Sequence, residues 1–303
     1  MNLKRIDAAC ATYERTSDEA TRARLAFFKP VWNIQAEAAQ AAASTVAAAA
    51  FVPADLERWY WEGLPFLLES PITIDAPLFA ETARKIAATL LAEGAFEGPT
   101  AQTLSTRDWF ETVTSAPLSM AGSDPAAYLD TAYEALQPDL GEEDAEAVVL
   151  VLSLALRPML EPVAEATLGA IAKDLKADSS QHAKPRRCPV CGGEACVAYV
   201  GPTSTGKPNG RTFYCSQCGA TWECERIRCA RCGTQSQTHL HYRSIEGDDT
   251  HRLHCCDLCS GYMRTRFAME GDLAPFVPEV EDVVMVRLDA LAESLGMGPQ
   301  PTA

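Results

Sequence analysis

The sequence predicts an α+β protein: a helical N-terminal domain, two tandem four-cysteine metal modules and a C-terminal helix. Three observations support this prediction. Residues 1–178 contain recurrent helix-forming runs and no alternation of apolar and polar residues of any length. Eight of the 12 cysteines then form four Cys-x-x-Cys pairs, and the last two pairs repeat the first two 41 positions later. Apolar residues at helical spacing follow near the end of the chain.

The N-terminal domain is expected to be a bundle of helices over residues 1–178. Prolines divide this region into helix-forming segments, of which residues 31–50 contain many alanines. Small side chains of this kind let a helix pack closely inside a bundle. Asp124 and Pro125 are suited to the N-cap and the first position of a further helix.

The last predicted helix of this domain spans residues 145–175. Pro158 and Pro162 are expected to kink this helix or to divide it in two, because proline lacks a backbone N–H and clashes with the preceding turn. The apolar run over residues 147–156 ends at Arg157 after about ten residues, which is too short to cross a membrane. Membrane insertion is therefore not expected.

A polar segment that contains a proline, residues 176–187, is the expected linker to the metal modules. The first module is assigned to residues 186–226 and the second to residues 227–270. Each has the pattern C-x2-C-x23-C-x2-C, and four thiolates in two close pairs form a closed tetrahedral site. A disulfide scaffold or a redox dithiol does not require four identical spacings. The predicted metal ligands are Cys188, Cys191, Cys215, Cys218, Cys229, Cys232, Cys256 and Cys259.

Each module is expected to contain a β-hairpin between its two cysteine pairs. Short apolar segments flank a turn that is rich in glycine and polar residues. The expected strand pairs are residues 196–200 with 211–214 and residues 239–242 with 251–255. Gly206 and Gly247 occupy the same position in the two turns, which supports a structural repeat.

The cysteine pairs have the form of metal-binding knuckles. The sequence CPVCGG at residues 188–193 is the knuckle found in rubredoxins and zinc ribbons, so both modules are expected to be rubredoxin-like or zinc-ribbon-like. Glycine follows the second cysteine at Gly192, Gly219 and Gly233, whereas Ser260 takes this place in the fourth knuckle. A glycine there frees backbone N–H groups to donate to the sulfurs. Because Ser260 departs from the other three knuckles, the second site is expected to be looser or more exposed. Because iron and zinc both accept four sulfurs, the spacing alone leaves the metal open.

The chain is predicted to end with a helix over residues 278–297. Val284, Leu288 and Leu295 lie on one face of such a helix. Gly296 follows the last apolar residue and is expected to end the helix. The apolar face is expected to pack on the metal modules or on the N-terminal bundle.

The remaining cysteines and the histidines are not expected to bind metal. Cys255 takes the place of Tyr214 in the repeat and is expected to fill an apolar position. Both sites already have four sulfurs, so the nearby histidines are expected to be packing or surface residues. These are His239, His241, His251 and His254.

The chain is acidic, with 41 Asp and Glu residues against 26 Lys and Arg residues and a net charge of −15. Such a chain repels phosphate backbones, so no nucleic acid partner is expected. Five arginines nevertheless surround the first and third knuckles, either as a phosphate-binding patch or as compensation for the anionic thiolates. The net charge favours compensation. They are Arg186, Arg187, Arg226, Arg228 and Arg231.

The sequence contains no signal for export and no motif of an enzyme. Lys4 and Arg5 are followed by Asp7 rather than by an apolar segment, so a cytoplasmic location is expected. Thiols stay reduced in the cytoplasm, which favours metal over disulfides. No catalytic residue is predicted, because the sequence has neither a glycine-rich phosphate loop nor a nucleophile motif.

A set of short motifs in the C-terminal part resembles one protein family. The motifs are CPVCGG (188–193), RTFYCSQC (211–218) with Trp222, RIRCARCG (226–233), HYRSIE (241–246) with Asp248 and Asp249, CDLC (256–259) with Tyr262, and the acidic positions Glu281, Asp282 and Asp289. In these motifs, over roughly residues 186–296, the chain resembles the formate dehydrogenase accessory proteins of the FdhE type. The first 180 residues resemble the family only as a helical domain of suitable length.

The resemblance implies a cytoplasmic, non-enzymatic protein that acts like a dedicated chaperone in the maturation of respiratory formate dehydrogenase. The implied partner is the molybdenum- or tungsten-containing catalytic subunit. The resemblance also implies rubredoxin-type modules that bind two iron ions per chain through the eight predicted cysteines, with zinc as the alternative. Two further functions stay open: rubredoxin-like electron transfer and, ranked last, nucleic-acid binding by zinc ribbons. The sequence does not indicate the oligomeric state.

Overall fold

The computed structural model describes residues 1–46, 53–174, 183–203, 206–270 and 275–298. The helices are α1 Leu3–Thr16, α2 Glu19–Val46, α3 Pro53–Glu62, α4 Phe66–Glu69, α5 Ala76–Ala92, α6 Gly98–Thr106, α7 Trp109–Val113, α8 Leu118–Ala121, α9 Pro125–Leu140, α10 Glu142–Asp174, α11 Pro278–Val284 and α12 Arg287–Ser294. The strands are β1 Val197–Gly201, β2 Gly210–Tyr214, β3 Thr221–Cys224, β4 Leu240–Arg243, β5 His251–Cys256 and β6 Tyr262–Phe267.

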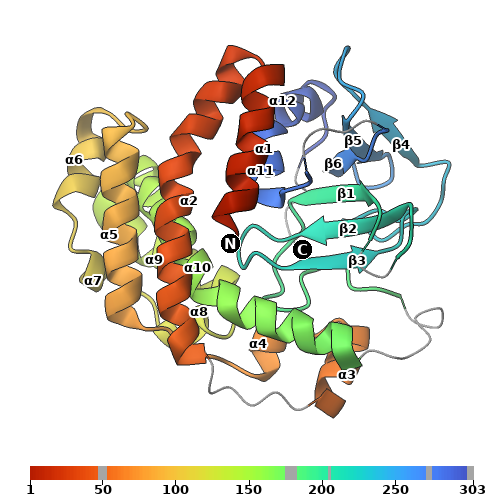
Figure 1. Cartoon of the computed structure of the whole chain (residues 1–303). Helices are drawn as coiled ribbons and strands as arrows, with labels where there is room; N and C mark the ends of the chain where they lie inside the picture. The colour runs from red at the N-terminus through yellow and green to blue at the C-terminus, as the bar shows by residue number, and fades with distance from the viewer. Residues whose placement is uncertain (47–52, 175–182, 204–205, 271–274, 299–303) are drawn as a thin grey trace.

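The N-terminal helices pack beside a sheet formed by the C-terminal part of the chain (Figure 1). Helices α11 and α12 follow the strands and lie near α1 and the sheet (Figure 1). This arrangement confirms the predicted α+β fold: a helical N-terminal part, two four-cysteine groups and a helical C-terminal segment. The proposed domain boundaries at residues 178, 226 and 270 stay a prediction.

Helix α9 begins as the sequence predicts, whereas α2 begins earlier than predicted. The Asp124 side chain accepts a hydrogen bond from the backbone N–H of Ala127 at 3.1 Å, and Pro125 is the first residue of α9. Helix α2 starts at Glu19 and runs through Pro30, so this proline does not divide the region as expected. The helix covers residues 31–46 of the predicted alanine-rich helix, and residues 47–50 lie outside the described part of the chain. Local capping chemistry therefore sets the start of α9.

Helix α10 runs through Pro158 and Pro162 as one helix. Of the two alternatives expected from the prolines, division into two helices is therefore wrong, and a kink stays a prediction. Pro158 has no N–H to donate to the carbonyl of Leu154, four residues earlier. The buried side chain of Gln35 in α2 replaces this donor, because its Nε2 donates to the Leu154 oxygen at 2.8 Å. A contact from a distant helix thus satisfies the carbonyl that the proline leaves free.

Helix α10 is long and apolar enough to cross a membrane by length and composition, over residues 142–172. This finding exceeds the short apolar run that the sequence suggested. However, 72% of its most apolar stretch is buried inside the protein. Helix α10 packs against α2, α5 and α9. Its place in the core accounts for its apolar composition.

Replacing Gln35 with leucine is expected to lower the free energy of unfolding by about 2 kcal/mol, because the carbonyl of Leu154 would lose the Gln35 donor that replaces the missing N–H of Pro158. Urea denaturation measures this change. The control is Gln40→Leu at an exposed position of the same helix, which should stay within about 0.5 kcal/mol of the wild type. Equal stabilities of the two variants would contradict the role given to Gln35.

The two metal modules form one six-stranded sheet in the order β3-β2-β1-β6-β5-β4. Strands β1 and β2 are antiparallel, as are β4 and β5, which confirms the two predicted hairpins. Each hairpin gains a third antiparallel strand, β3 or β6, that was not predicted from the sequence. Parallel pairing of β1 with β6, with Val197 opposite Arg264, joins the two modules into one sheet.

The two hairpin turns have matching backbone conformations. Gly206 and Gly247 each have a φ of +82°. Glycine adopts such a left-handed conformation readily, whereas other residues do so at a cost. The turns therefore confirm that the offset of 41 residues relates equivalent structural positions.

The C-terminal segment forms two helices rather than the single helix that was predicted. Helix α11 ends at Val284, and α12 begins at Arg287. The break lets the two helices cover different apolar surfaces, because Val280 in α11 packs with α1 whereas Leu288 in α12 packs with the strands. Gly296 follows α12 with a φ of +67°, as predicted for the end of a helix.

The largest apolar core joins the N-terminal helices to the first metal module. It contains Leu152 of α10 together with Phe213 of β2 and Trp222 of β3. The four cysteines of the first module belong to the same core. In the second module, Leu253 and Cys255 pack into a smaller cluster with α12. The first module is thus built into the main core, and much of the second lies outside it.

Candidate metal centres

The eight predicted cysteines lie together in two groups of four. The first centre consists of Cys188, Cys191, Cys215 and Cys218, and the second centre consists of Cys229, Cys232, Cys256 and Cys259. Within each centre the four Sγ atoms all lie within 4.8 Å of one another. Close Sγ–Sγ distances are 3.5 and 3.6 Å in the first centre and 3.7 Å for two pairs in the second.

These distances fit a metal ion and do not fit disulfides. A disulfide joins two sulfurs at about 2.05 Å. A tetrahedron with metal–sulfur bonds of about 2.3 Å places its sulfurs about 3.8 Å apart. Burial also raises the pKa of the Cys218 thiol well above its ordinary value, so a thiolate at this position requires a neighbouring cation. The donor set and geometry suit zinc or iron equally.

The knuckles share one backbone arrangement. In the first knuckle the Cys188 N–H donates to the Gly193 oxygen at 2.8 Å, and the Gly192 N–H donates to the Cys188 oxygen at 3.0 Å. Equivalent pairs of bonds occur in the second and third knuckles. The residue after the second cysteine has a positive φ in all four knuckles. The values are +76° at Gly192, +77° at Gly219, +79° at Gly233 and +52° at Ser260.

Ser260 therefore occupies a backbone conformation that favours glycine. This conformation costs a residue with a Cβ about 1–2 kcal/mol. We expect Ser260→Gly to raise the free energy of unfolding of the metal-loaded protein by about 1 kcal/mol. Denaturation with urea measures the effect.

The matched control for this prediction is Gly233→Ala, in the other knuckle of the second centre. It should lower the stability, because φ is +79° and the added Cβ would lie 3.1 Å from the Arg186 Nε. A loss of stability in Ser260→Gly would contradict the account of the fourth knuckle.

The two centres differ in their exposure to solvent. All four cysteines of the first centre are buried. In the second centre, Cys232 is exposed and Cys259 is half-buried. Ser260 in place of a glycine suggested that the second centre is more exposed, and the structure agrees with that expectation.

Arginines connect the two centres. Arg186 donates to the backbone oxygen of Arg231, and Arg231 forms an ion pair with Glu194. Arg186 also lies against Gly233 of the third knuckle, and Arg187 pairs with Glu194 at 3.7 Å. These guanidinium groups lie next to the knuckles and are already paired with protein groups. Their placement favours compensation of the thiolates over a phosphate-binding patch.

Cys255 and His254, which lie outside the two centres, have packing roles. Cys255 is fully buried in the cluster with Tyr214 and α12, as the repeat predicted. His254 is buried and stacks on Tyr242 with ring centroids 4.9 Å apart. Burial, with a smaller contribution from Arg211, lowers the pKa of His254 to about 3, so it is neutral. In the described part of the chain, no histidine joins either group of four cysteines.

His251 lies at the centre of a buried polar network that was not predicted. Its Nδ1 is 2.9 Å from an oxygen of Asp248, and its Nε2 is 3.0 Å from an oxygen of Glu281. The other oxygen of Glu281 accepts a hydrogen bond from Tyr13 at 2.8 Å and lies 2.9 Å from the Arg266 Nε. All five side chains are buried.

The network makes His251 a charged residue at neutral pH. Burial disfavours the imidazolium, but the hydrogen bonds to Asp248 and Glu281 outweigh this effect and raise the pKa of His251 to about 9. The network links α1, β5, β6 and α11, so it joins the start of the chain to the second module. No spacing in the sequence indicates it, because its members come from segments far apart along the chain.

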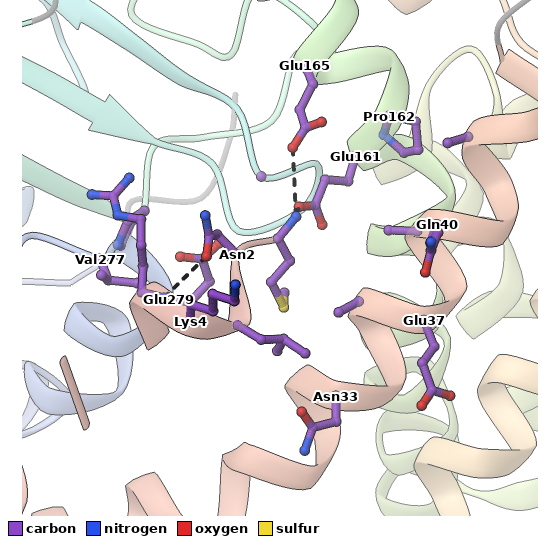
Figure 2. Close-up of a pocket in the computed structure, with 18 of the residues that line it drawn as sticks. Asn2, Lys4, Asn33, Glu37, Gln40, Glu161, Pro162, Glu165, Val277 and Glu279 are labelled. Atoms are coloured by element: carbon purple, nitrogen blue, oxygen red, sulfur yellow. Dashed lines mark hydrogen bonds and ion pairs between the residues drawn. The ribbon is translucent and has the colours of Figure 1, made fainter. Parts of the chain in front are cut away.

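A cavity of about 960 Å³ lies beside the first centre, between the start of α1, α2 and α10. Figure 2 shows Glu37 of α2 and Glu161 and Glu165 of α10 around this cavity, with Lys4 of α1 nearby. Gly219 of the second knuckle also lines it, but no cysteine does. The cavity thus borders the first centre without reaching its sulfurs.

Comparisons with known proteins show that the chain is similar to proteins named FdhE. No protein-family model matches the chain. Over 107 residues it is 31% identical to the protein FdhE homolog of Rhizobium meliloti (strain 1021), a match that spans 34% of this chain and 33% of that relative. The match thus spans about a third of the length of the curated relative.

The whole fold is similar to the crystal structure of the FdhE protein from Pseudomonas aeruginosa. The two structures have a TM-score of 0.57 at 19% sequence identity, and the match covers 99% of this chain and 93% of that one. At this identity the likeness shows a shared fold. Together with the sequence match, it confirms the resemblance to FdhE-type proteins that the C-terminal motifs suggested.

Proposed function

We propose that this chain is an FdhE-type accessory protein that serves the maturation of respiratory formate dehydrogenase. In this proposal it acts in the cytoplasm and binds the molybdenum- or tungsten-containing catalytic subunit of that enzyme. The observation that carries the proposal is the likeness in fold over 99% of the chain to a protein named FdhE. The sequence match to an FdhE homolog and the two four-cysteine centres support it.

The same proposal assigns one metal ion to each centre, and iron is the preferred metal with zinc as the alternative. Cys188, Cys191, Cys215 and Cys218 would hold the first ion, and Cys229, Cys232, Cys256 and Cys259 would hold the second. A metal bound by four thiolates stabilises the small fold around it. The protein's own contribution is to gather the sulfurs, to bury those of the first centre and to place arginines beside the knuckles. We assign no catalytic step to the chain.

The test compares host cells that contain the chain with cells that lack it. Without the chain, formate oxidation by cell extracts should fall to background, although the catalytic polypeptide of formate dehydrogenase is still made. Wild-type chain and the Gln40→Leu control should restore activity, and Cys188→Ser should not. Unchanged formate oxidation in cells that lack the chain would refute the proposal.

Binding to the catalytic subunit needs a separate experiment. Tagged chain should co-purify with the catalytic subunit when the molybdenum or tungsten cofactor is withheld, and less of the subunit should be recovered from cells with assembled enzyme. Recovery of the same amount in both conditions would show that the chain does not select an immature client.

Electron transfer is a second candidate function, and the exposure of Cys232 favours it. A one-electron carrier of this type requires iron that changes between two oxidation states. Zinc supports the same four-sulfur geometry without redox chemistry. Zinc-loaded protein that restores formate dehydrogenase fully would therefore exclude this role.

A further inference from the structure

The two centres are equivalent in the repeat, but different parts of the protein cover them. At the first centre, the segment that begins α4 lies along the first knuckle. The N–H of Phe66 donates to the Pro189 oxygen at 2.8 Å, and the N–H of Leu67 donates to the Val190 oxygen at 2.9 Å. The backbone of the first knuckle is thus held by hydrogen bonds from the N-terminal helical part.

The helical part also closes over the glycines of the first centre. A Cβ added at Gly192 would lie 2.9 Å from Pro65. A Cβ added at Gly219 would lie 3.3 Å from the Arg157 Nη2 and 3.6 Å from the Glu161 side chain, both in α10. Both knuckles of the first centre therefore press against the helical part.

The equivalent positions of the second centre have fewer contacts with the helical part and are more exposed. Arg231 takes the place of Val190, and its backbone oxygen accepts from the Arg186 side chain rather than from a backbone N–H of a helical segment. Leu258 takes the place of Gln217 and is 61% exposed. Ser260 takes the place of Gly219 and is exposed, with a φ of +52°.

The ligand cysteines of the two centres also differ in their exposure to solvent. Cys191 and Cys218 in the first centre are 3% and 0% exposed. Their counterparts 41 residues later are Cys232, which is exposed, and Cys259, which is half-buried. Each of these pairs has the same place in the repeat, so the surroundings alone account for the difference.

From these contacts we propose that the second centre is an exchangeable metal site, whereas the first centre holds its ion as a permanent part of the core. The inference rests on the metal binding of the proposed function. Exchange at the second centre is a ligand substitution in which external nitrogen or sulfur donors replace the thiolates, beginning at Cys232 and Cys259. Each released thiolate takes up one proton from solvent, and no electron is transferred.

Access to the sulfurs determines the rate of such a substitution. An incoming ligand reaches the second centre in the folded protein through the exposed Cys232. At the first centre it reaches a sulfur only after local unfolding of the main core, and such openings are rare. The second ion should therefore leave at least about tenfold faster than the first.

The experiment uses the full chain loaded with zinc and the coloured chelator 4-(2-pyridylazo)resorcinol. The chain should hold two ions and release them in two phases of equal amplitude, separated at least about tenfold in rate. In Cys232→Ser the fast phase should be lost and a single slow ion should remain.

Labelling identifies the centres without any substitution. Native zinc-loaded protein is treated with iodoacetamide and analysed by mass spectrometry over time. Among the eight ligands, Cys232 and Cys259 should be alkylated first, and the four cysteines of the first centre should stay protected until the slow phase. This readout holds even where Cys232→Ser fails to fold.

The outcomes separate this inference from the metal binding on which it depends. Fewer than two zinc ions in a folded chain would overturn both. Two ions that leave with one rate, or alkylation that begins at Cys191 or Cys218, would overturn the exchangeable site and leave the metal binding intact. Two phases with early labelling of Cys232 and Cys259 support the proposal.

Discussion

Replacing Cys188 with serine is expected to remove one metal ion per chain and to lower the free energy of unfolding by roughly 5 kcal/mol or more. The free energy of binding a structural ion is also folding free energy, and it is about 10–16 kcal/mol for small zinc-binding peptides. Cys188 lies in the main apolar core, so losing the ion should destabilise the N-terminal helices as well as the first module. Metal analysis and urea denaturation measure the two effects.

The equivalent change in the second module, Cys229→Ser, is the matched comparison. It should also remove one ion, but the N-terminal helices should keep most of their stability, because the second centre lies outside the main core. Retention of two ions in either variant would show that the ligand assignment is wrong. Equal destabilisation of the helices would show that the two modules do not differ in their attachment to the core.

Replacing Glu281 with leucine is expected to lower the free energy of unfolding by about 3–5 kcal/mol. The change would remove the buried carboxylate that His251 and Arg266 share, and removing one partner from a buried ion pair is strongly destabilising. The control is Glu81→Gln, which removes an exposed ion pair with Arg84 and should change stability by less than about 1 kcal/mol. Equal effects of the two changes would contradict the importance of the buried network.

The same network predicts a pH dependence with a definite sign. The folded-state pKa of His251 is raised from 6.5 to about 9, so the charged imidazole contributes stability that is fully present below pH 6.5. This contribution is lost as the pH rises from 6.5 to 9. The stability difference between wild type and Glu281→Leu should therefore shrink over this range. A difference that stays constant or grows would show that His251 is neutral in the folded protein.

Features of the fold that depend on local chemistry could be predicted from the sequence. The N-cap at Asp124 and the hairpin turns at Gly206 and Gly247 require only neighbouring residues, and the structure has each of them. Features that depend on distant contacts could not be predicted. Helix α10 continues through Pro158 because Gln35, more than one hundred residues away, supplies the missing donor. The break between α11 and α12 likewise follows from two apolar surfaces that form only in the folded protein.

The candidate metal centres show the same division. Two identical spacings were enough to group the eight cysteines, because a knuckle places its two sulfurs on one tight turn. One local feature of the sequence, Ser260 in place of a glycine, indicated that the two centres differ in exposure. No local feature of the sequence indicated the network around His251, because Tyr13, Asp248 and Glu281 come from three separate parts of the chain.

The metal content and sulfur coordination of the wild-type chain test the central claim most directly. The protein is purified without oxygen, and its metals are counted and examined by X-ray absorption. The account predicts two ions per chain, each bound by four sulfurs at about 2.3 Å. Folded protein with fewer than one ion per chain would contradict it.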